Sequence, residues 1–133
     1  MPRYLLDTNA VSNLINDPRG RVAGAIERVG ETSICTSIIV AAELQFGAAK
    51  KKSRRLLTQI ETALAHLDIQ PFAVPAHRIY GELRADLERK GRPIGPNDLL
   101  IAAHALALGC ILVTDNGREF SRVKSLRVEN WLI

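Results

Sequence analysis

Short apolar segments alternate along the chain with stretches in which apolar residues recur every three or four positions. The short segments are typical of buried strands, and the longer periodic stretches are typical of amphipathic helices. Strands are expected at residues 4–6, 34–35, 69–70 and 110–113, with an edge strand near Val128 and Trp131 as a packing anchor. Strands that alternate with helices predict an α/β fold, in which helices cover both faces of a mainly parallel sheet.

Six helices are expected between these strands. The side chains of Asp7, Thr8 and Asn9 can cap the first, Thr36 or Ser37 the third, and Gly109 ends the last. Residues 99–108 are apolar almost all round, which places that helix in the centre of the domain. The positions that define the helices are Val11, Leu14 and Ile15; Val22, Ala25, Ile26 and Val29; Ile38 to Ala48; Leu57, Ile60, Leu64 and Leu67; Ile79, Leu83 and Leu87, after Pro75 in the first turn; and Leu99 to Leu108.

Glycine and proline mark the connections between these elements. Asp17-Pro18-Arg19-Gly20 predicts a turn, and Arg92-Pro93-Ile94-Gly95-Pro96 predicts a loop that delivers Asn97 and Asp98 to the start of the central helix. Asp115-Asn116-Gly117 predicts a turn towards Phe120. With 133 residues and no low-complexity linker, a single domain over residues 1–133 is expected.

Composition narrows the class of protein only a little. Apolar residues make up 47% of the chain, and no apolar run approaches the roughly 20 residues of a membrane-spanning helix. The N-terminus lacks the long apolar stretch of a secretory signal, so a cytoplasmic protein is expected. Cys35 and Cys110 lie in apolar segments without zinc-site spacing and are interpreted as buried small hydrophobes. The net charge of +4 gives weak support for a polyanionic partner such as RNA.

Four acidic residues are the candidate chemistry. Asp7, Glu43, Asp98 and Asp115 each lie in or beside an apolar segment that is expected to be buried. The carboxyl ends of parallel strands open into one crevice, where helices begin, so all four side chains are predicted to converge there. Buried carboxylates need protons, partners or cations, and oxygen-only ligands suit Mg²⁺ or Mn²⁺. Such an ion lowers the pKa of its bound water and stabilises phosphoryl charge, which is the chemistry of phosphodiester hydrolysis.

Each acid also has an ordinary structural role as an alternative. Asp7 could only cap a helix, and Asp98 could only stabilise a helix N-terminus. Asp115 could belong only to the Asp-Asn-Gly turn, and Glu43 could be an exposed glutamate on an amphipathic helix. The hypothesis of a joint site therefore depends on all four acids lying together.

Several motifs together resemble the PIN-domain ribonucleases of the VapC toxin type. They are Leu6-Asp7-Thr8-Asn9, Ala42-Glu43-Leu44 with Gly47 following, Gly95-Pro96-Asn97-Asp98, Val113-Thr114-Asp115, Arg118-Glu119-Phe120 and the ending Leu126-Arg127-Val128-Glu129-Asn130-Trp131. The resemblance covers essentially the whole chain. It implies a three-layer α/β/α fold with a central twisted sheet and a Mg²⁺- or Mn²⁺-dependent endoribonuclease. It further implies inhibition by a cognate VapB antitoxin, and commonly a homodimer.

The resemblance also implies roles for individual residues. Asp7, Glu43 and Asp98 match the principal acids that hold the metal, and Thr8, Asn9 and Thr114 match polar positions nearby. The fourth acid often stands two residues after the threonine, where this chain has Asn116, while Asp115 stands one residue earlier. Which of these two positions serves the site is left open. Some similar toxins with a Gly-Arg-Pro-Ile/Val-Gly-Pro-like loop cut initiator tRNA, so the resemblance alone implies tRNA as the RNA.

Basic residues gather mainly at one place in the sequence. Contacts with RNA phosphates are expected there, with Arg92 adding to a second basic region that includes Arg84, Arg89 and Lys90. A solvated connection between helices is an equal alternative. His104 is expected to be a core or supporting histidine on the central helix. The residues of the main basic run are Lys50, Lys51, Lys52, Arg54 and Arg55.

Two rival functions remain on the sequence alone. Phosphoaspartyl enzymes also place an acid at a strand end, but a haloacid-type phosphatase has a second Asp where this chain has Asn9. A receiver-type domain needs a lysine at a late strand end, and Thr114-Asp115-Asn116 offers none. The non-enzymatic alternative is an RNA-binding or antitoxin-binding module whose acids are structural.

Overall fold

A computed structural model describes residues 3–133, and its centre is a five-stranded parallel sheet. The five expected strands are confirmed, and the second continues past Cys35 to Ser37. The order across the sheet is β3-β2-β1-β4-β5. The strands are β1 (Tyr4–Leu6), β2 (Ile34–Ser37), β3 (Asp68–Gln70), β4 (Ile111–Val113) and β5 (Val128–Glu129).

All six expected helices are present in the structure. The third continues beyond Ala48 to Lys51, Leu67 lies just past the end of the fourth, and Pro75 immediately precedes the fifth. The helices are α1 (Thr8–Asn16), α2 (Arg21–Val29), α3 (Ile38–Lys51), α4 (Arg54–Ala65), α5 (Ala76–Arg89) and α6 (Pro96–Leu108). Two single turns, the 3₁₀ helix Glu31–Ser33 and α7 (Gly117–Phe120), were not predicted, because elements this short have no apolar period.

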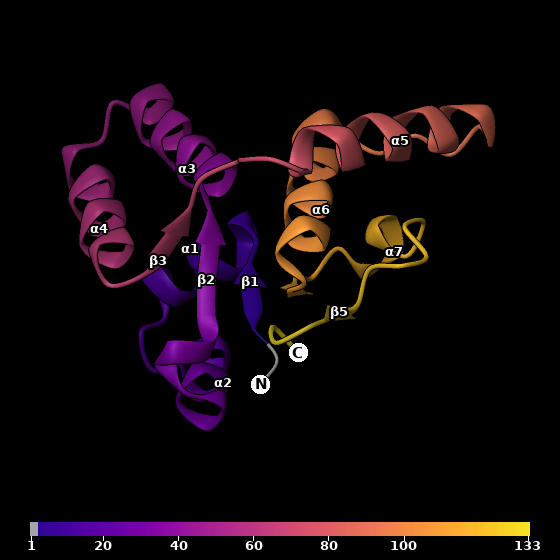
Figure 1. Cartoon of the computed structure of the whole chain (residues 1–133). Coiled ribbons are helices and arrows are strands. Elements are labelled where there is room, and N and C mark those ends of the chain that lie inside the picture. Colours follow the sequence, from indigo (N-terminus) through magenta and orange to yellow (C-terminus); the bar gives the residue numbers. More distant parts are fainter. Residues whose placement is uncertain (1–2) are drawn as a thin grey trace.

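The helices and the sheet form the three-layer α/β/α arrangement. Figure 1 shows α3 and α4 grouped beside β3, and α5 and α6 grouped on the other side of the central strands. The expected central helix is confirmed, since α6 buries six residues, among them Ile101 and His104. At the edge near β5, Trp131 is buried and its ring centroid lies 5.0 Å from that of Tyr4.

The connection order makes the carboxyl end of β1 the expected place for a ligand. From β1 the chain first builds β2 and β3 on one side, and it returns later to build β4 and β5 on the other. Ligands of open α/β sheets bind outside the carboxyl ends of the strands at such a switch point. Asp7 follows β1 there, and its backbone N–H donates to the carbonyl of Val113, the last residue of β4, at 3.0 Å.

The two cysteines are buried, as expected of small hydrophobes. Cys35 and Cys110 are free thiols whose Sγ atoms lie 3.8 Å apart within the core. None of the helices in the described part of the chain is long and apolar enough to cross a membrane.

Candidate active site

Asp7 is the most deeply buried of the acids. It is 5% exposed and caps α1, where its Oδ1 accepts a 2.9 Å hydrogen bond from the backbone N–H of Ala10. Burial raises the pKa of Asp7 to about 6, repulsion from Asp115 and Asp98 adds to the rise, and hydrogen bonds from Thr114 and Ala10 oppose it. Helix capping therefore explains only some of the surroundings of Asp7, because a capping residue needs neither burial nor neighbouring acids.

Glu43 lies in the middle of α3 and connects three helices. Its Oε1 accepts a 2.6 Å hydrogen bond from Thr8 Oγ1 at the start of α1. Its Oε2 accepts a 3.2 Å bond from Asn97 Nδ2 at the start of α6. The side chain is partly buried, so the alternative of an exposed glutamate on an amphipathic helix is wrong.

Asp98 opens α6, two residues after its first residue Pro96. Burial raises the pKa of Asp98 to about 6, and repulsion from Glu119 and Glu43 raises it further, while a hydrogen bond from Asn116 opposes the rise. The two repulsions come from nearby carboxylates, so Asp98 lies close to the acid of α3 and to an acid of α7.

The two candidates for the fourth position have different surroundings. Asp115 is exposed, accepts a 2.8 Å hydrogen bond from Asn9 Nδ2, and contributes to the raised pKa of Asp7. Asn116 donates instead to Glu119 Oε2 at 3.2 Å and to Asp98. Asp115 is therefore a neighbour of Asp7, and Asn116 is a neighbour of Asp98.

Glu119 is a fifth acid that the sequence reasoning did not place at the site. Its Oε1 accepts a 2.9 Å hydrogen bond from the backbone N–H of Gly95, in the loop that leads to Asp98. Its charge is the largest electrostatic contribution to the raised pKa of Asp98. Asn116 and Glu119 are three residues apart, a spacing that brings two side chains together only in a helical turn. Because the sequence predicted a non-helical turn at residues 115–117, this spacing did not indicate a contact between the two side chains.

No basic side chain neutralises these acids within residues 3–133. The ion pairs there join Arg3 to Asp68 and pair Arg84, Arg89 and Lys90 with acids of α5. Uncompensated carboxylates at short range are disfavoured, and their oxygen atoms are the donors that Mg²⁺ and Mn²⁺ prefer. The residue types therefore fit a divalent cation.

The acidic side chains are not arranged as a complete metal site in the described part of the chain. Across residues 3–133, no three Asp, Glu, His or Cys side chains are close enough together to hold an ion. Hydrogen bonds hold Glu43 between Thr8 and Asn97, and Asp7 on the backbone of Ala10. Binding of one ion by several of these acids therefore requires their side chains to move from these positions.

His104 lies in the core. It is 1% exposed, and its Nδ1 lies 2.8 Å from the hydroxyl of Ser37, which caps α3 at the backbone N–H of Ile39. Burial lowers its pKa, which favours the neutral ring. The expected supporting role is consistent with this contact between α6 and the helix that carries Glu43.

The basic run spans the end of α3, the short connection after it and the start of α4. None of its side chains pairs with an acid in the part of the chain that the structure describes. The second basic region is different, because Arg84 pairs with Glu88, and Arg89 and Lys90 pair with Asp86. Of that region, Arg92 alone has no acidic partner among the described residues.

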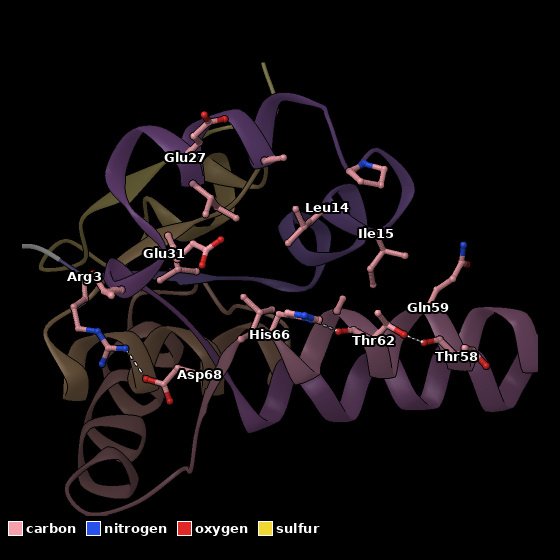
Figure 2. A pocket seen from close by; sticks show the side chains of 17 residues that line it. Arg3, Leu14, Ile15, Glu27, Glu31, Thr58, Gln59, Thr62, His66 and Asp68 are labelled. Atoms are coloured by element: carbon pink, nitrogen blue, oxygen red, sulfur yellow. Dashed lines mark hydrogen bonds and ion pairs between the residues drawn. The ribbon is translucent and has the colours of Figure 1, made fainter.

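A cavity of about 1220 Å³ lies on another part of the surface, and none of the five acids lines it. Figure 2 shows Leu14 and Ile15 of α1 facing Thr58 and Thr62 of α4 across it. Glu27 and Glu31 contribute acidic side chains at the α2 end. Arg3, Thr32, Gln59, His66 and Asp68 add further polar side chains, and the apolar part of the walls includes Pro18, Ala23, Ile26, Ile34, Ala63 and Leu67.

Comparisons with known proteins agree with this fold and these motifs. The sequence model of the PIN domain matches residues 4–126. Ribonuclease VapC2 of Rickettsia felis is 42% identical over 130 residues, covering 96% of this chain and 97% of that protein. The tRNA(fMet)-specific endonuclease VapC of Shigella flexneri is 38% identical over 135 residues, covering 98% of this chain and 99% of that protein.

A solved structure extends the agreement to three dimensions. VapBC2 from Rickettsia felis, bound to a DNA fragment from its promoter, contains a chain that superposes with a TM-score of 0.87 at 40% identity. The match covers 96% of this chain and 98% of that one. The protein belongs to the PIN-domain family and, within it, to the VapC ribonucleases.

Proposed function

We propose that this protein is the toxin of a type II toxin-antitoxin pair and an endoribonuclease that depends on Mg²⁺ or Mn²⁺. The observation that carries the proposal is the mutual repulsion of the acids: in addition to burial, the charge of Asp98 raises the pKa of Asp7 and that of Glu43 raises the pKa of Asp98, and no basic side chain of residues 3–133 pairs with them. Relatives named as ribonucleases support the reaction class. In an RNA-binding module without catalytic activity, acids without basic partners would destabilise the fold and serve no purpose.

Asp7 and Asp98 would hold the ion directly, with Glu43 beside them. When bound, the cation supplies a Lewis acid that stabilises charge on phosphoryl oxygens and makes water more acidic. Thr8 and Asn97 hold both oxygens of Glu43, so this carboxylate is oriented before substrate arrives. Asp115, which is exposed and bonded to Asn9, is free to accept a proton or orient a water molecule.

The RNA substrate that we propose is tRNA, and initiator tRNA in particular. One relative, matched over 99% of its own length, is named as a tRNA(fMet)-specific endonuclease. The basic run, with Lys50, Lys51, Lys52, Arg54 and Arg55, would contact phosphates, and Arg92 would add a charge in the loop before Asp98. Such RNA is found in the cytoplasm, where we place the protein.

We assign the antitoxin to the cavity between α1, α2 and α4. An amphipathic helix buries one apolar face, and the cavity offers Leu14, Ile15 and Ile26 to receive it. Glu27 and Glu31 would pair with basic residues on the flank of that helix. A similar chain is known in a VapBC complex, which supports a VapB-type partner, and a homodimer of this chain completes the proposed assembly.

The experiment that tests the function is sequencing of RNA 5′ ends after brief induction of the protein in cells. Wild-type protein should create new ends at one or a few sites in tRNA, and growth should stop. Asp98→Asn should create none while the purified variant keeps its fold and RNA affinity. Equal cleavage and toxicity from both proteins would overturn the proposal. Asp17→Asn, which removes an acid from the turn before α2, is the matched control.

A further inference from the structure

One face of α3 continues beyond the acid site. At about 100° per residue, Glu43, Phe46, Gly47 and Lys50 fall within an arc of about 100° on the helix. Phe46 lies about 4.5 Å and Lys50 about 10.5 Å further along the helix axis than Glu43. A ligand held at Glu43 and extended along this face therefore meets Phe46 and then Lys50.

Phe46 is the unusual residue of this face. Its side chain is 67% exposed, although phenylalanine is among the residues most often buried. The ammonium of Lys50 lies 6.0 Å from the centre of the ring, over its face. The pair thus presents an aromatic surface and a positive charge together at the surface of the molecule.

Gly47 leaves the space between Glu43 and Lys50 open. A Cβ atom placed on Gly47 would meet no other atom within 4 Å, so the helix surface is bare there. This bare strip gives an incoming chain close access to the backbone of α3 between the acid and the lysine.

We propose that Phe46 and Lys50 form a binding subsite for one unpaired nucleotide next to the phosphodiester that is cut. Phe46 stacks on the base and Lys50 binds a neighbouring phosphate. The substrate is therefore RNA that is single-stranded at the cleavage site, because a paired base does not expose its face for stacking. The inference rests on the proposed nuclease function and deepens it.

Charge favours RNA over a protein partner on this face. Lys50 begins a run of five basic residues within six positions, none of which has an acidic partner in residues 3–133. Five adjacent positive charges strongly attract a phosphate backbone, and their mutual repulsion is relieved when phosphates bind. An apolar protein surface would leave these charges desolvated.

The affinity of the Asp98→Asn variant for a single-stranded RNA that spans a mapped cleavage site tests the subsite. Replacing one nucleotide next to that site by an abasic nucleotide should weaken binding on the order of 10-fold, the usual loss of one base stacked on an aromatic ring. Adding Phe46→Ala should weaken binding of the intact RNA to the same extent and remove the abasic effect. Phe46→Trp should keep both, and Lys50→Ala should reduce the salt slope by about 1.

Val74→Ala is the matched control, because Val74 is 82% exposed but lies outside α3. An abasic effect that persists in Phe46→Ala would overturn the subsite. The subsite is equally overturned if Phe46→Ala changes only the oligomeric mass or the affinity for the antitoxin, since the face is then a protein interface. Cleavage by the protein with native Asp98 is scored separately, so failure of the nuclease proposal is distinguishable from failure of the subsite.

Discussion

Thr8 donates a 2.6 Å hydrogen bond to Oε1 of Glu43, a residue 35 positions away in the sequence. Thr8 follows Asp7 directly, so this bond fixes the acid of α3 relative to the acid that caps α1. Asn97 makes the same kind of connection from α6, directly before Asp98. Glu43 is thus positioned by the polar neighbours of two other acids.

Thr8→Val is predicted to misplace Glu43 without unfolding the protein. Valine keeps the shape but removes the donor, at a cost of about 1 kcal/mol in unfolding free energy. The catalytic rate should fall about 10-fold or more, while RNA affinity changes little. Thr58→Val, which removes an exposed bond to the carbonyl of Arg54 on α4, is the control and should leave the rate unchanged. An unchanged rate in Thr8→Val would contradict the orienting role.

Asp7→Asn is predicted to stabilise the metal-free protein while it abolishes cleavage. Asparagine still caps α1, but it removes a buried charge that repels Asp115 and Asp98. A pKa raised from 3.8 to about 6 corresponds to a gain of about 3 kcal/mol at neutral pH as an upper figure. Chemical denaturation in EDTA measures this change. Lower stability of Asp7→Asn than of wild type would show that the carboxylate is a structural cap and not a destabilised ligand.

The stability of metal-free protein should fall as pH rises from about 4 to about 6. The folded-state pKa of Asp7 and of Asp98 is about 6, above the ordinary 3.8, so the folded chain holds more protons in this window. The lowered pKa values of Asp68 and Asp86 act only below that window. The lowered pKa of His104 opposes the fall towards pH 6, but one histidine offsets only part of the effect of two carboxyl groups. Thermal unfolding with EDTA tests the slope, and saturating Mg²⁺ should reverse it because the ion binds the charged form. A rising stability from pH 4 to 6 in EDTA would be the opposite result.

Glu119→Gln is predicted to lower the pKa of Asp98. The amide oxygen can still accept from the backbone of Gly95, but the negative charge that raises the pKa of Asp98 is removed. Carboxyl NMR titration of labelled Asp98 in metal-free protein measures the shift. Glu61→Gln on the exposed face of α4 serves as control. An unshifted titration of Asp98 would remove Glu119 from the site.

Ala63→Arg is predicted to release the toxin from its antitoxin without loss of cleavage. Ala63 lines the cavity between α1, α2 and α4, and arginine would fill it with a bulky charged side chain. Binding of the antitoxin, measured by calorimetry, should weaken at least 10-fold, whereas RNA cleavage by the isolated toxin should be unaltered. Glu61→Arg on the same helix lies outside the cavity and should bind normally. Normal binding by Ala63→Arg would place the antitoxin elsewhere.

Most of the architecture was predictable, because each strand and long helix carries its own apolar period. The central helix is the clearest case, since residues 99–108 are apolar all round and α6 is buried accordingly. The motifs also predicted which acids belong together. In the structure, in addition to burial, the charge of Asp98 raises the pKa of Asp7, that of Glu43 raises the pKa of Asp98, and Thr8 next to Asp7 bonds Glu43. Their roles in metal binding and catalysis remain predictions.

The parts that escaped prediction depend on single turns and on long-range contacts. Glu119 reaches Gly95 only because α7 forms one helical turn after Asn116, and four residues carry no period. The cavity beside Ile26 is lined by α1, α2 and α4, and no local pattern specifies how these three helices are arranged. The exposed ring of Phe46 was equally invisible, since a sequence does not show which apolar side chain stays in water.

The most direct measurement is the anomalous difference density of a crystal soaked in Mn²⁺, collected at neutral pH. We expect a peak between the carboxylates of Asp7 and Asp98, with Glu43 at or next to it, and we expect the peak to vanish in Asp98→Asn. Saturating Mn²⁺ with no peak between these two side chains would contradict the cation site on which the proposed chemistry depends.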